Sequence, residues 1–208
     1  MNIATSTESP AKPTESLHKR TKDRMRAETA SIGIQLFLER GFDDVTVEDI
    51  CALAGLSRRS FFRYFSAKEE IVMGVFADLA DRGWRAFLHR PVDDALWPAL
   101  RHSMDPMTEW ATADPDRAVA MIRLIDASPS LRAAFLDRVD TWRKLLAGVV
   151  SKRLGLEATN DLYAAVVAAA AMGAFVSGAR AWADRGGRDR LDELFDEAFA
   201  AVYPMPLT

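Results

Sequence analysis

The sequence has a single cysteine, Cys51, among its 208 residues. One thiol excludes an intramolecular disulfide and a thiolate zinc site, so the chain suits a reducing compartment, and we expect it in the cytoplasm. Glycine and proline number only 11 and 9, and no segment repeats at a fixed period. Collagen-like, low-complexity and solenoid proteins are therefore excluded. A globular chain of this length has room for one large domain or two small ones.

Motifs for catalysis and metal binding are also missing. The three histidines, His18, His89 and His102, are scattered, and the sequence contains no G-x-S-x-G, no H-E-x-x-H and no glycine-rich phosphate loop. We therefore expect no enzyme activity, no cofactor and no metal site. Cys51 shares the apolar stripe of a short helix, which favours a small core residue over a redox sensor.

Long hydrophobic runs are scarce. One uncharged run, residues 162–179, approaches the length of a membrane span, but it is mostly alanine with Gly173, Ser177 and Gly178. This composition favours a buried or interface helix over a membrane span. Residues 1–16 are rich in Thr, Ser, Pro and Glu without the apolar stretch of a signal peptide, so we expect a disordered lead-in and no membrane partner.

Charges of the two signs nearly balance, with 27 Lys and Arg against 30 Asp and Glu, but the basic residues cluster. Residues 19–26 hold five basic residues and one acidic residue, a net of +4, and Arg58, Arg59 and Arg63 follow within six positions. A polyanion would therefore meet one specific face. Two interpretations of the 19–26 cluster stay open, a solvated tail or an arm laid along a DNA backbone or into the minor groove.

Helical periodicity dominates from Leu17 onward, and no sustained alternation marks a strand, so the sequence predicts an all-α protein. A first helix ends at Arg40–Gly41, a short second one follows the cap at Thr46, and Ser57 caps a third after the break at Gly55. Asp114-Pro115 and Ser128-Pro129 each place a capping side chain before a proline, so helices should start there, and glycines mark the ends of other helices. Pro98 and Pro106 kink or break the first helix after Pro91. These helices are expected near residues 68–91, 93–111, 116–126, 130–153, 159–184 and 189–202.

Two short helices joined by a glycine-containing turn, the second rich in arginine, are typical of a helix-turn-helix, whose second helix enters the DNA major groove. Arg58, Arg59 and Arg63 can fork onto guanine edges or phosphates. Ser60 can bond either, and the rings of Phe62 and Tyr64 suit thymine methyls, sugars and phosphates. A merely solvated helix face is the alternative, and the helix-turn-helix pattern favours DNA over it.

The run from Phe37 to Ile71 resembles the TetR family of bacterial regulators through L-F-x-E-R-G-F, T-V-E-D-I-x-x-x-A-G-L-S and F-F-R-Y-F-x-x-K-E-E. The resemblance implies about nine helices, with a DNA-binding domain at 17–66 and a ligand-binding, dimerising body at 67–208. It also places helices 159–184 and 189–202 in a dimerising four-helix bundle, with a small-residue surface on the first of them. Residues 123–132, R-L-I-D-A-S-P-S-L-R, resemble a subgroup proposed to bind acyl-CoA-like ligands.

Carried over by position, the resemblance implies a set of DNA contacts. They are Thr46, Arg58, Arg59, Ser60, Phe62, Arg63, Tyr64 and Lys68. Lys68 falls on the lysine that opens the fourth helix against a phosphate. The chain departs from the commoner Tyr-Tyr-His-Phe ending with Phe62-Arg63-Tyr64-Phe65, so Phe62 lacks a phosphate-binding hydroxyl and Tyr64 is the candidate to replace that contact.

Aromatic and methionine residues of the body are candidates to line a ligand cavity, although at helical spacing such residues are more often plain core. A helix bent at Pro106 packs badly and favours space beside it. Arg123, within an apolar stretch, either pairs with a buried carboxylate or binds an anionic ligand. The ligand candidates are Trp97, Met104, Met107, Trp110, Met121, Arg123, Trp142 and Met172.

These observations predict a homodimeric transcriptional repressor that binds a palindromic double-stranded DNA operator and is released by a small, mostly apolar effector. The helix that begins near Lys68 is the expected lever between the two sites. Two alternatives remain: a DNA-binding regulator without an effector, and a helical lipid- or acyl-chain-binding module whose basic patches face solvent.

Overall fold

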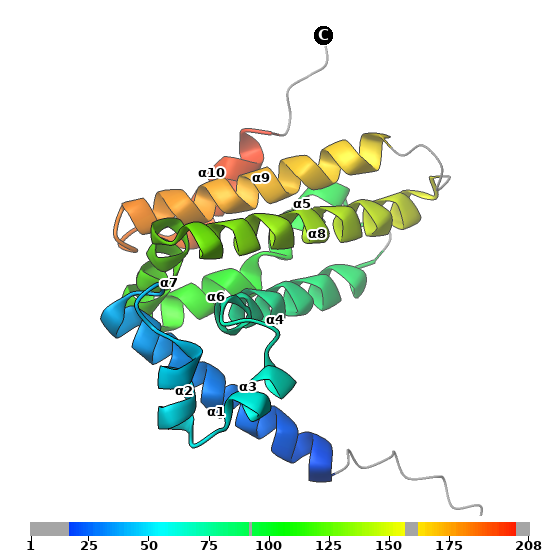
Figure 1. The fold of residues 1–208 in the computed structure, drawn as a ribbon. Helices are drawn as coiled ribbons and strands as arrows, with labels where there is room; N and C mark the ends of the chain where they lie inside the picture. Colours follow the sequence, from blue (N-terminus) through cyan, green and yellow to red (C-terminus); the bar gives the residue numbers. More distant parts are fainter. Residues whose placement is uncertain (1–16, 92, 157–161, 203–208) are drawn as a thin grey trace, which may run out of the picture.

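The computed structural model describes residues 17–91, 93–156 and 162–202, which form ten α-helices and no strand (Figure 1). The predicted all-α fold is confirmed. The lead-in expected at residues 1–16 lies outside the described residues, as does the expected start of the 159–184 helix.

The first three helices form the head at the lower end of Figure 1: α1 (Leu17–Arg40), α2 (Val47–Ala54) and α3 (Arg58–Tyr64). Phe37 and Phe61 are fully buried, and the Phe37 ring packs on Phe42 with centroids 4.8 Å apart. Burial of such rings supplies most of the stability that helices of seven or eight residues lack on their own. The head therefore depends on α1 as the support for α2 and α3.

The basic cluster at residues 19–26 forms the first turns of α1. Arg24 forms an ion pair with Glu28 at 2.7 Å, one helical turn later. Arg26 lies over the ring of Phe65, 5.6 Å from its centroid. The cluster thus presents its charge along a helix surface that is continuous with the head.

Seven helices build the body, in which α8, α9 and α10 pack together above α4 and α6 (Figure 1). Asp114 and Ser128 cap helices that begin at Pro115 and Pro129, as the sequence predicts. The fourth helix starts beside the head and runs into the body. The seven are α4 (Glu69–Leu88), α5 (Leu96–His102), α6 (Asp105–Ala113), α7 (Pro115–Ala127), α8 (Pro129–Leu154), α9 (Leu162–Asp184) and α10 (Leu191–Ala200).

The helix expected at 93–111 is broken into α5 and α6. Pro106 has no N–H to continue the hydrogen-bond ladder, and it lies in the first turn of the new helix, where none is needed. The break lies against α4, where a Cβ on Gly83 would come within 2.2 Å of the Ser103 carbonyl oxygen. Glycine at position 83 therefore allows α4 to pass the break closely.

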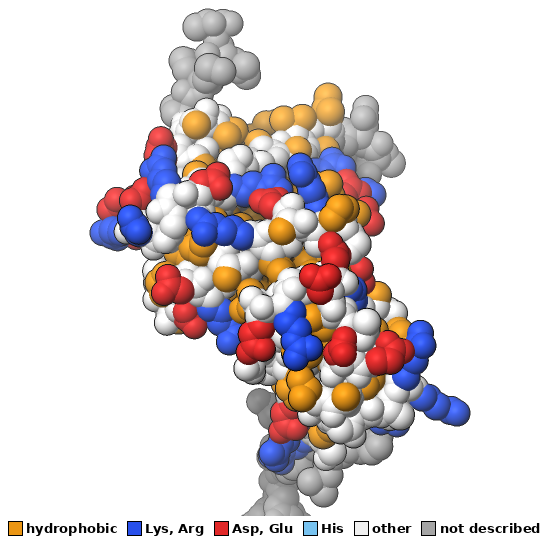
Figure 2. Space-filling view, turned by 60° about the vertical axis from the view of Figure 1, so that its left-hand side comes forward, with side chains coloured by type: hydrophobic (Ala, Val, Ile, Leu, Met, Phe, Trp, Pro, Cys, Tyr) orange, Lys and Arg blue, Asp and Glu red, His pale blue; other side chains and the backbone are white. Residues whose placement is uncertain are grey.

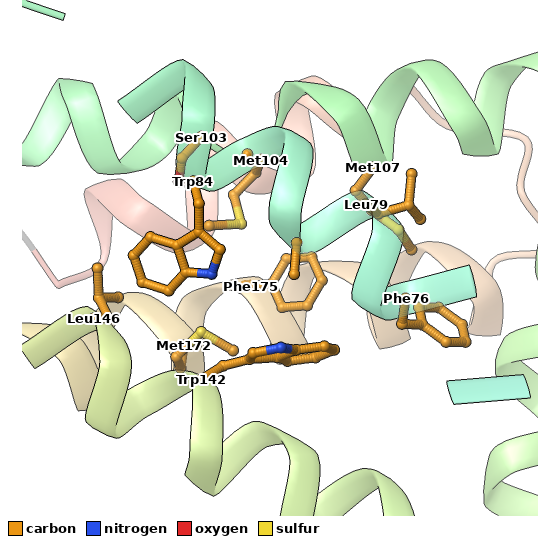
Figure 3. Close-up of a pocket in the computed structure, with 12 residues that line it drawn as sticks. Phe76, Leu79, Trp84, Ser103, Met104, Met107, Trp142, Leu146, Met172 and Phe175 are labelled. Atoms are coloured by element: carbon orange, nitrogen blue, oxygen red, sulfur yellow. The ribbon is translucent and has the colours of Figure 1, made fainter. Parts of the chain in front are cut away.

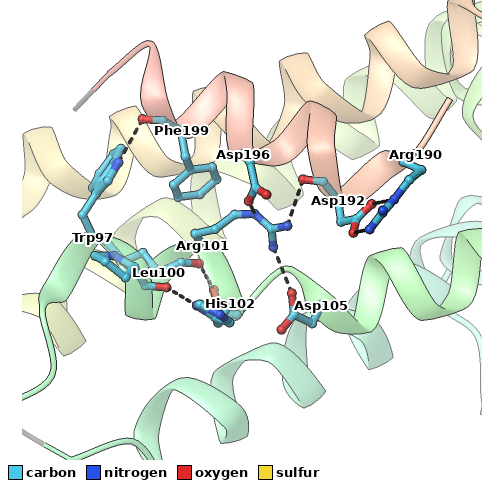
Figure 4. A network of polar contacts seen from close by, with 11 residues as sticks. Trp97, Leu100, Arg101, His102, Asp105, Arg190, Asp192, Asp196 and Phe199 are labelled. Atoms are coloured by element: carbon cyan, nitrogen blue, oxygen red, sulfur yellow. Dashed lines mark hydrogen bonds and ion pairs between the residues drawn. The ribbon is translucent and has the colours of Figure 1, made fainter. Parts of the chain in front are cut away.

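A half-buried arginine fastens α10 to α5 (Figure 4). The Arg101 side chain is only 12% exposed, and its guanidinium donates to Asp196 at 2.6 Å, Asp105 at 2.9 Å and the Asp192 carbonyl at 2.9 Å. The Trp97 indole donates to the Phe199 carbonyl at 2.9 Å. These bonds satisfy polar groups that would be costly to bury alone.

By length and composition α9 could cross a membrane. In this structure it packs between α8 and α10, with Ala164, Ala168 and Ala171 fully buried. A Cβ on Gly178 would lie 2.7 Å from the Phe195 ring, so α9 and α10 approach closely. The arrangement agrees with the packed helix expected from the sequence.

Candidate DNA-binding and ligand-binding sites

The turn between α2 and α3 depends on one left-handed residue. Gly55 has φ +64°, and its N–H and that of Leu56 both donate to the Cys51 carbonyl. A residue with a side chain rarely adopts this conformation. Ser57 then accepts the Ser60 N–H at 3.1 Å and starts α3. The local chemistry therefore fixes the angle between the two helices.

The outer face of α3 carries the arginines expected to contact DNA. Arg58, Arg59, Phe62 and Arg63 are exposed, with the Phe62 side chain 44% accessible. Arg58 pairs with Glu48 at 3.0 Å, and its guanidinium lies 5.6 Å from the Phe62 ring centroid. In the space-filling view this end of the molecule exposes both basic and acidic side chains (Figure 2).

Arg63 and the half-buried Tyr64 form a pair on the same helix. The Arg63 guanidinium lies 5.1 Å from the Tyr64 ring centroid and donates to its hydroxyl at 3.0 Å. Stacking on a ring holds an arginine in one orientation more firmly than solvent does. Arg58 and Arg63 thus each have an aromatic neighbour that orients the guanidinium group, Phe62 and Tyr64 respectively.

Thr46, another predicted DNA contact, forms hydrogen bonds at the start of α2. The Thr46 hydroxyl donates to Asp49 at 2.6 Å and accepts its N–H at 3.1 Å, which completes a capping box. Hydrogen bonds from the Thr46 hydroxyl and N–H hold the pKa of Asp49 below its ordinary value. Thr46 therefore caps α2 in this structure.

Lys68, the expected phosphate contact, is also bound within the head. Its ammonium donates to the carbonyls of Phe42 at 2.9 Å and Val45 at 3.0 Å, and it lies 4.3 Å from the Phe42 ring centroid. Two of its three donors are thus used inside the head. Sequence position alone could not show this, because the acceptors lie more than twenty residues earlier in the chain.

The loop between α1 and α2 is also bound to the body. The Ser128 hydroxyl, at the junction of α7 and α8, donates to the Asp43 carboxylate at 2.8 Å. Ser128 is 2% exposed, so this bond satisfies a buried polar group. The same hydroxyl also accepts the Leu131 N–H and caps α8.

Cys51 lies in the core of the head, as expected. Burial raises the pKa of its thiol, and the neighbouring Glu48 adds to the effect. The group is therefore a poor thiolate nucleophile. Within the described ranges, no three His, Cys, Asp or Glu side chains gather in a way that could hold a metal ion.

A pocket opens in the body between α4, α6, α8 and α9 (Figure 3). It contains about 570 Å³ of space free of atoms, part of it open to solvent. Aromatic and methionine side chains dominate the lining, and Trp84 and Trp142 face the space from different helices. The lining residues are Phe76, Leu79, Ala80, Gly83, Trp84, Ser103, Met104, Met107, Trp142, Leu146, Met172 and Phe175.

Four of the predicted ligand residues line this pocket: Met104, Met107, Trp142 and Met172. The other four lie elsewhere, each for a different reason. Trp97 binds α10 as described, and Trp110 stacks edge-on against Phe76 at 5.7 Å. Met121 is core, 1% exposed. Arg123 meets neither a buried carboxylate nor the pocket but donates to the Ala183 carbonyl at 3.0 Å, at the end of α9.

Sequence reasoning missed the contribution of α4, whose residues from Phe76 to Trp84 line one side of the pocket. Their helical spacing is the same whether they face core or cavity, so the pattern could indicate only an inward face. Gly83 was the available signal, because a glycine inside a helix often marks a close backbone approach. Here that approach is to Ser103 at the pocket wall.

Two family matches together cover most of the described chain. Residues 32–74 match the family described as bacterial regulatory proteins, tetR family, and residues 94–205 match the MftR C-terminal domain. The transcriptional regulator TcmR of Streptomyces glaucescens is 28% identical over 196 residues, which cover 89% of this chain and 84% of TcmR. The putative mycofactocin biosynthesis regulator MftR of Mycobacterium tuberculosis is 29% identical, covering 91% and 95%.

Solved structures show the same fold. A putative TetR-family regulator from Syntrophomonas wolfei has a TM-score of 0.65 at 15% identity, covering 89% of this chain and 99% of its own. The repressor FadR of Thermus thermophilus, crystallised with lauroyl-CoA, has a TM-score of 0.58 at 21% identity, covering 88% and 95%. Because the C-terminal match alone spans more than half of the chain and the helix-turn-helix match precedes it, the protein belongs to the TetR family and is a DNA-binding transcriptional regulator.

Proposed function

We propose that this regulator is a cytoplasmic, homodimeric repressor without catalytic activity, released from a palindromic operator by a small, mostly apolar molecule. One observation carries the proposal: α4 connects the DNA-binding head to the pocket. Lys68, directly before α4, holds the α1–α2 loop of the head, and Phe76 to Trp84 of α4 line the pocket. A ligand that displaces this helix would therefore move the head.

The DNA contacts that we propose come from the outer face of α3. Arg58, Arg59 and Arg63 supply guanidinium groups, while Ser60, Phe62 and Tyr64 supply a hydroxyl and two rings. We also propose Thr46 and Lys68 as DNA contacts, since two of the three Lys68 donors have partners within the protein and the third is available for a phosphate. Affinity should fall steeply with salt, because each phosphate contact releases counterions.

The lining of the pocket supports an apolar ligand. Ser103 and the two indole N–H groups are its polar side-chain groups, and no charged residue lines it. A tenfold loss of operator affinity needs a preference of about 1.4 kcal/mol for the released state. Two methylene groups that are buried in the released state but not in the DNA-bound state, at about 0.8 kcal/mol each, would supply that preference. An acyl chain or an aromatic ring system meets this requirement.

The homodimer that we propose is built on α8 and α9. Their outward surfaces expose Leu136, Leu145, Tyr163 and Val166, and hydrophobic side chains line the upper edge of the body in Figure 2. The outward side of α10 is acidic instead, through Glu193, Asp196 and Glu197. This distribution favours α8 over α10 as the partner of α9 in the four-helix bundle.

The test compares operator binding with and without candidate ligands. Duplexes selected from a random library would supply the operator, and a panel of acyl-CoA esters, fatty acids and aromatic acids would supply the ligands. We expect at least one compound to lower operator affinity and to change tryptophan fluorescence over the same concentration range.

The variant Met104→Trp fills the pocket and should reduce both responses while ligand-free DNA binding stays intact. Leu88→Trp, at an exposed site on α4, is the matched control and should respond as the wild type does. If no compound released DNA, the effector-free alternative would replace ligand control.

A further inference from the structure

A second hollow lies next to the pocket and contains about 370 Å³ of space free of atoms, open solvent included. The two adjoin each other, because Phe76, Met107 and Phe175 line both of them. Methionine has several easily rotated bonds and adapts readily to a new neighbour. A ligand in the first space can therefore extend into the second with small side-chain movements.

The two hollows follow one another along α9. Met172 lines the first, Phe175 lines both, and Val176, Ala179 and Arg180 line the second. From Met172 to Arg180 the helix axis advances about 12 Å, at ~1.5 Å per residue. The combined space is therefore elongated, with its direction set by α9.

Charge is present at only one end of this elongated space. Asp126 and Arg180 line the second hollow, and the Arg180 guanidinium meets the Asp126 carboxylate at 2.7 Å. Both side chains are partly exposed, at 42% and 36%, so their pairing contributes little to stability. The other lining residues of both hollows carry no charge. An anionic group on a ligand could therefore take the place of Asp126 at little cost.

We propose that the two hollows form one site for an elongated amphiphile with an anionic end, anchored by Arg180, with Asp126 as the competing internal anion. A planar guanidinium matches carboxylate and phosphate oxygens alike, so the anionic end is one of these two groups. The proposal rests on the proposed function, because it names the chemical class of the effector that occupies the same pocket.

The test measures direct binding to the full chain without DNA. The probes are dodecanoate, dodecyl phosphate and the uncharged methyl dodecanoate, titrated by calorimetry below their aggregation concentrations. Arg180→Gln should weaken binding of the preferred anion about tenfold, and Arg180→Lys should restore part of the loss. Asp126→Asn should strengthen binding of the same anion, because it removes the competitor. The two anions distinguish a carboxylate from a phosphate end.

Methyl dodecanoate distinguishes an anchoring role of Arg180 from a merely structural one. A variant that merely distorted the pocket would weaken the ester and the anions alike, whereas loss of an anchor leaves ester binding unchanged. Three outcomes would overturn the proposal. Each anion could bind all variants with the same affinity, the affinities for ester and anion could change in parallel, or neither anion could bind the wild type. Operator release by an uncharged ligand would then leave the proposed function standing, whereas failure of every ligand to release DNA would overturn that function itself.

Discussion

The arginines of α3 differ in what holds them before DNA is bound. Arg58 is held by Glu48 and the Phe62 ring, and Arg63 by the Tyr64 ring and hydroxyl. Preorganised side chains lose less conformational entropy on binding. Arg63, whose partner Tyr64 lies on α3 itself, keeps its full charge for DNA, whereas Arg58 must leave or share the Glu48 carboxylate. We therefore expect Arg63 to contribute more to base discrimination.

Arg63→Ala tests this expectation. If Arg63 contacts a base, the substitution should cost about 1–3 kcal/mol of discrimination at one position of the operator and leave the other positions unchanged. Binding to a set of duplexes with single base-pair changes measures the effect. Arg85→Ala, an exposed arginine on α4 away from α3, is the control and should bind all duplexes as the wild type does. A uniform loss across the set would assign Arg63 to the DNA backbone instead.

In the candidate DNA-binding and ligand-binding sites, the sequence predicts which side chains are involved better than it predicts their contacts. The motif around the α2–α3 turn indicates which side chains face outward, because the turn and its caps are local chemistry. It could not predict that Lys68 holds the Phe42 and Val45 carbonyls, since that contact depends on how a distant loop folds back. Nor could the sequence separate the four ligand candidates that line the pocket from the four that lie away from it, because side chains that face the core and side chains that face a cavity have the same helical spacing.

The boundaries of the helices can be predicted from local sequence signals, but the face that each helix buries cannot. Asp114-Pro115 and Ser128-Pro129 predict the starts of α7 and α8 because cap and proline act on adjacent residues. The predicted small-residue surface of α9 divides into two faces instead. Ala164, Ala168 and Ala171 are buried within the chain, whereas Ala169 and Gly173 face outward. Alanine suits either environment, so composition cannot tell an internal contact from an external one.

Two helix-interior glycines lie on the helices of the dimer that we propose. Apart from its own helical turn, no part of the described chain lies within 4 Å of a Cβ built on Gly148 of α8 or Gly173 of α9. Glycine in mid-helix costs roughly 0.5–1 kcal/mol relative to alanine, and nothing among the described residues offsets that cost. Close packing of a partner helix would do so. Both glycines lie on the helices that expose the apolar side chains proposed for the dimer.

Val166→Glu tests the dimer directly, because it places a charge on the exposed α9 face. We expect the wild type to sediment as a dimer at micromolar concentration and the variant to shift toward the monomer, with helix content unchanged by circular dichroism. Binding to a palindromic duplex should weaken in parallel, since two recognition helices about 34–36 Å apart contact successive major grooves. Leu88→Glu, an equally exposed site outside α8 and α9, should remain dimeric. A monomeric wild type would contradict the assignment.

Across the protein, the head is joined to the body by more than the continuous helix α4. The bond from Ser128 to Asp43 ties the α1–α2 loop to the junction of α7 and α8. Asp126, two residues before Ser128, lines the second hollow, as does Phe135 of α8. Displacement of α7 by a ligand would thus act on the loop from one side while α4 acts on it through Lys68 from the other.

Asp43→Ala removes this second connection and leaves Ser128 free to cap α8. We expect operator affinity without ligand to change little, and the fold-loss of affinity caused by the most effective compound of the ligand panel to become smaller. Paired binding titrations with and without that compound give the ratio. Asp44→Ala, the neighbouring exposed residue on the same loop, should keep the wild-type ratio. An unchanged ratio in Asp43→Ala would leave α4 as the sole proposed route.

Lys68 and Ser128 hold the α1–α2 loop through different groups. Lys68 binds the backbone carbonyls of Phe42 and Val45, and Ser128 binds the side chain of Asp43 between them, so the loop is linked both to the start of α4 and to the α7–α8 junction. In the dimer that we propose, a ligand that displaces either contact would turn the two heads relative to each other without altering either recognition helix. The span between the recognition helices would then no longer match two successive major grooves of the operator.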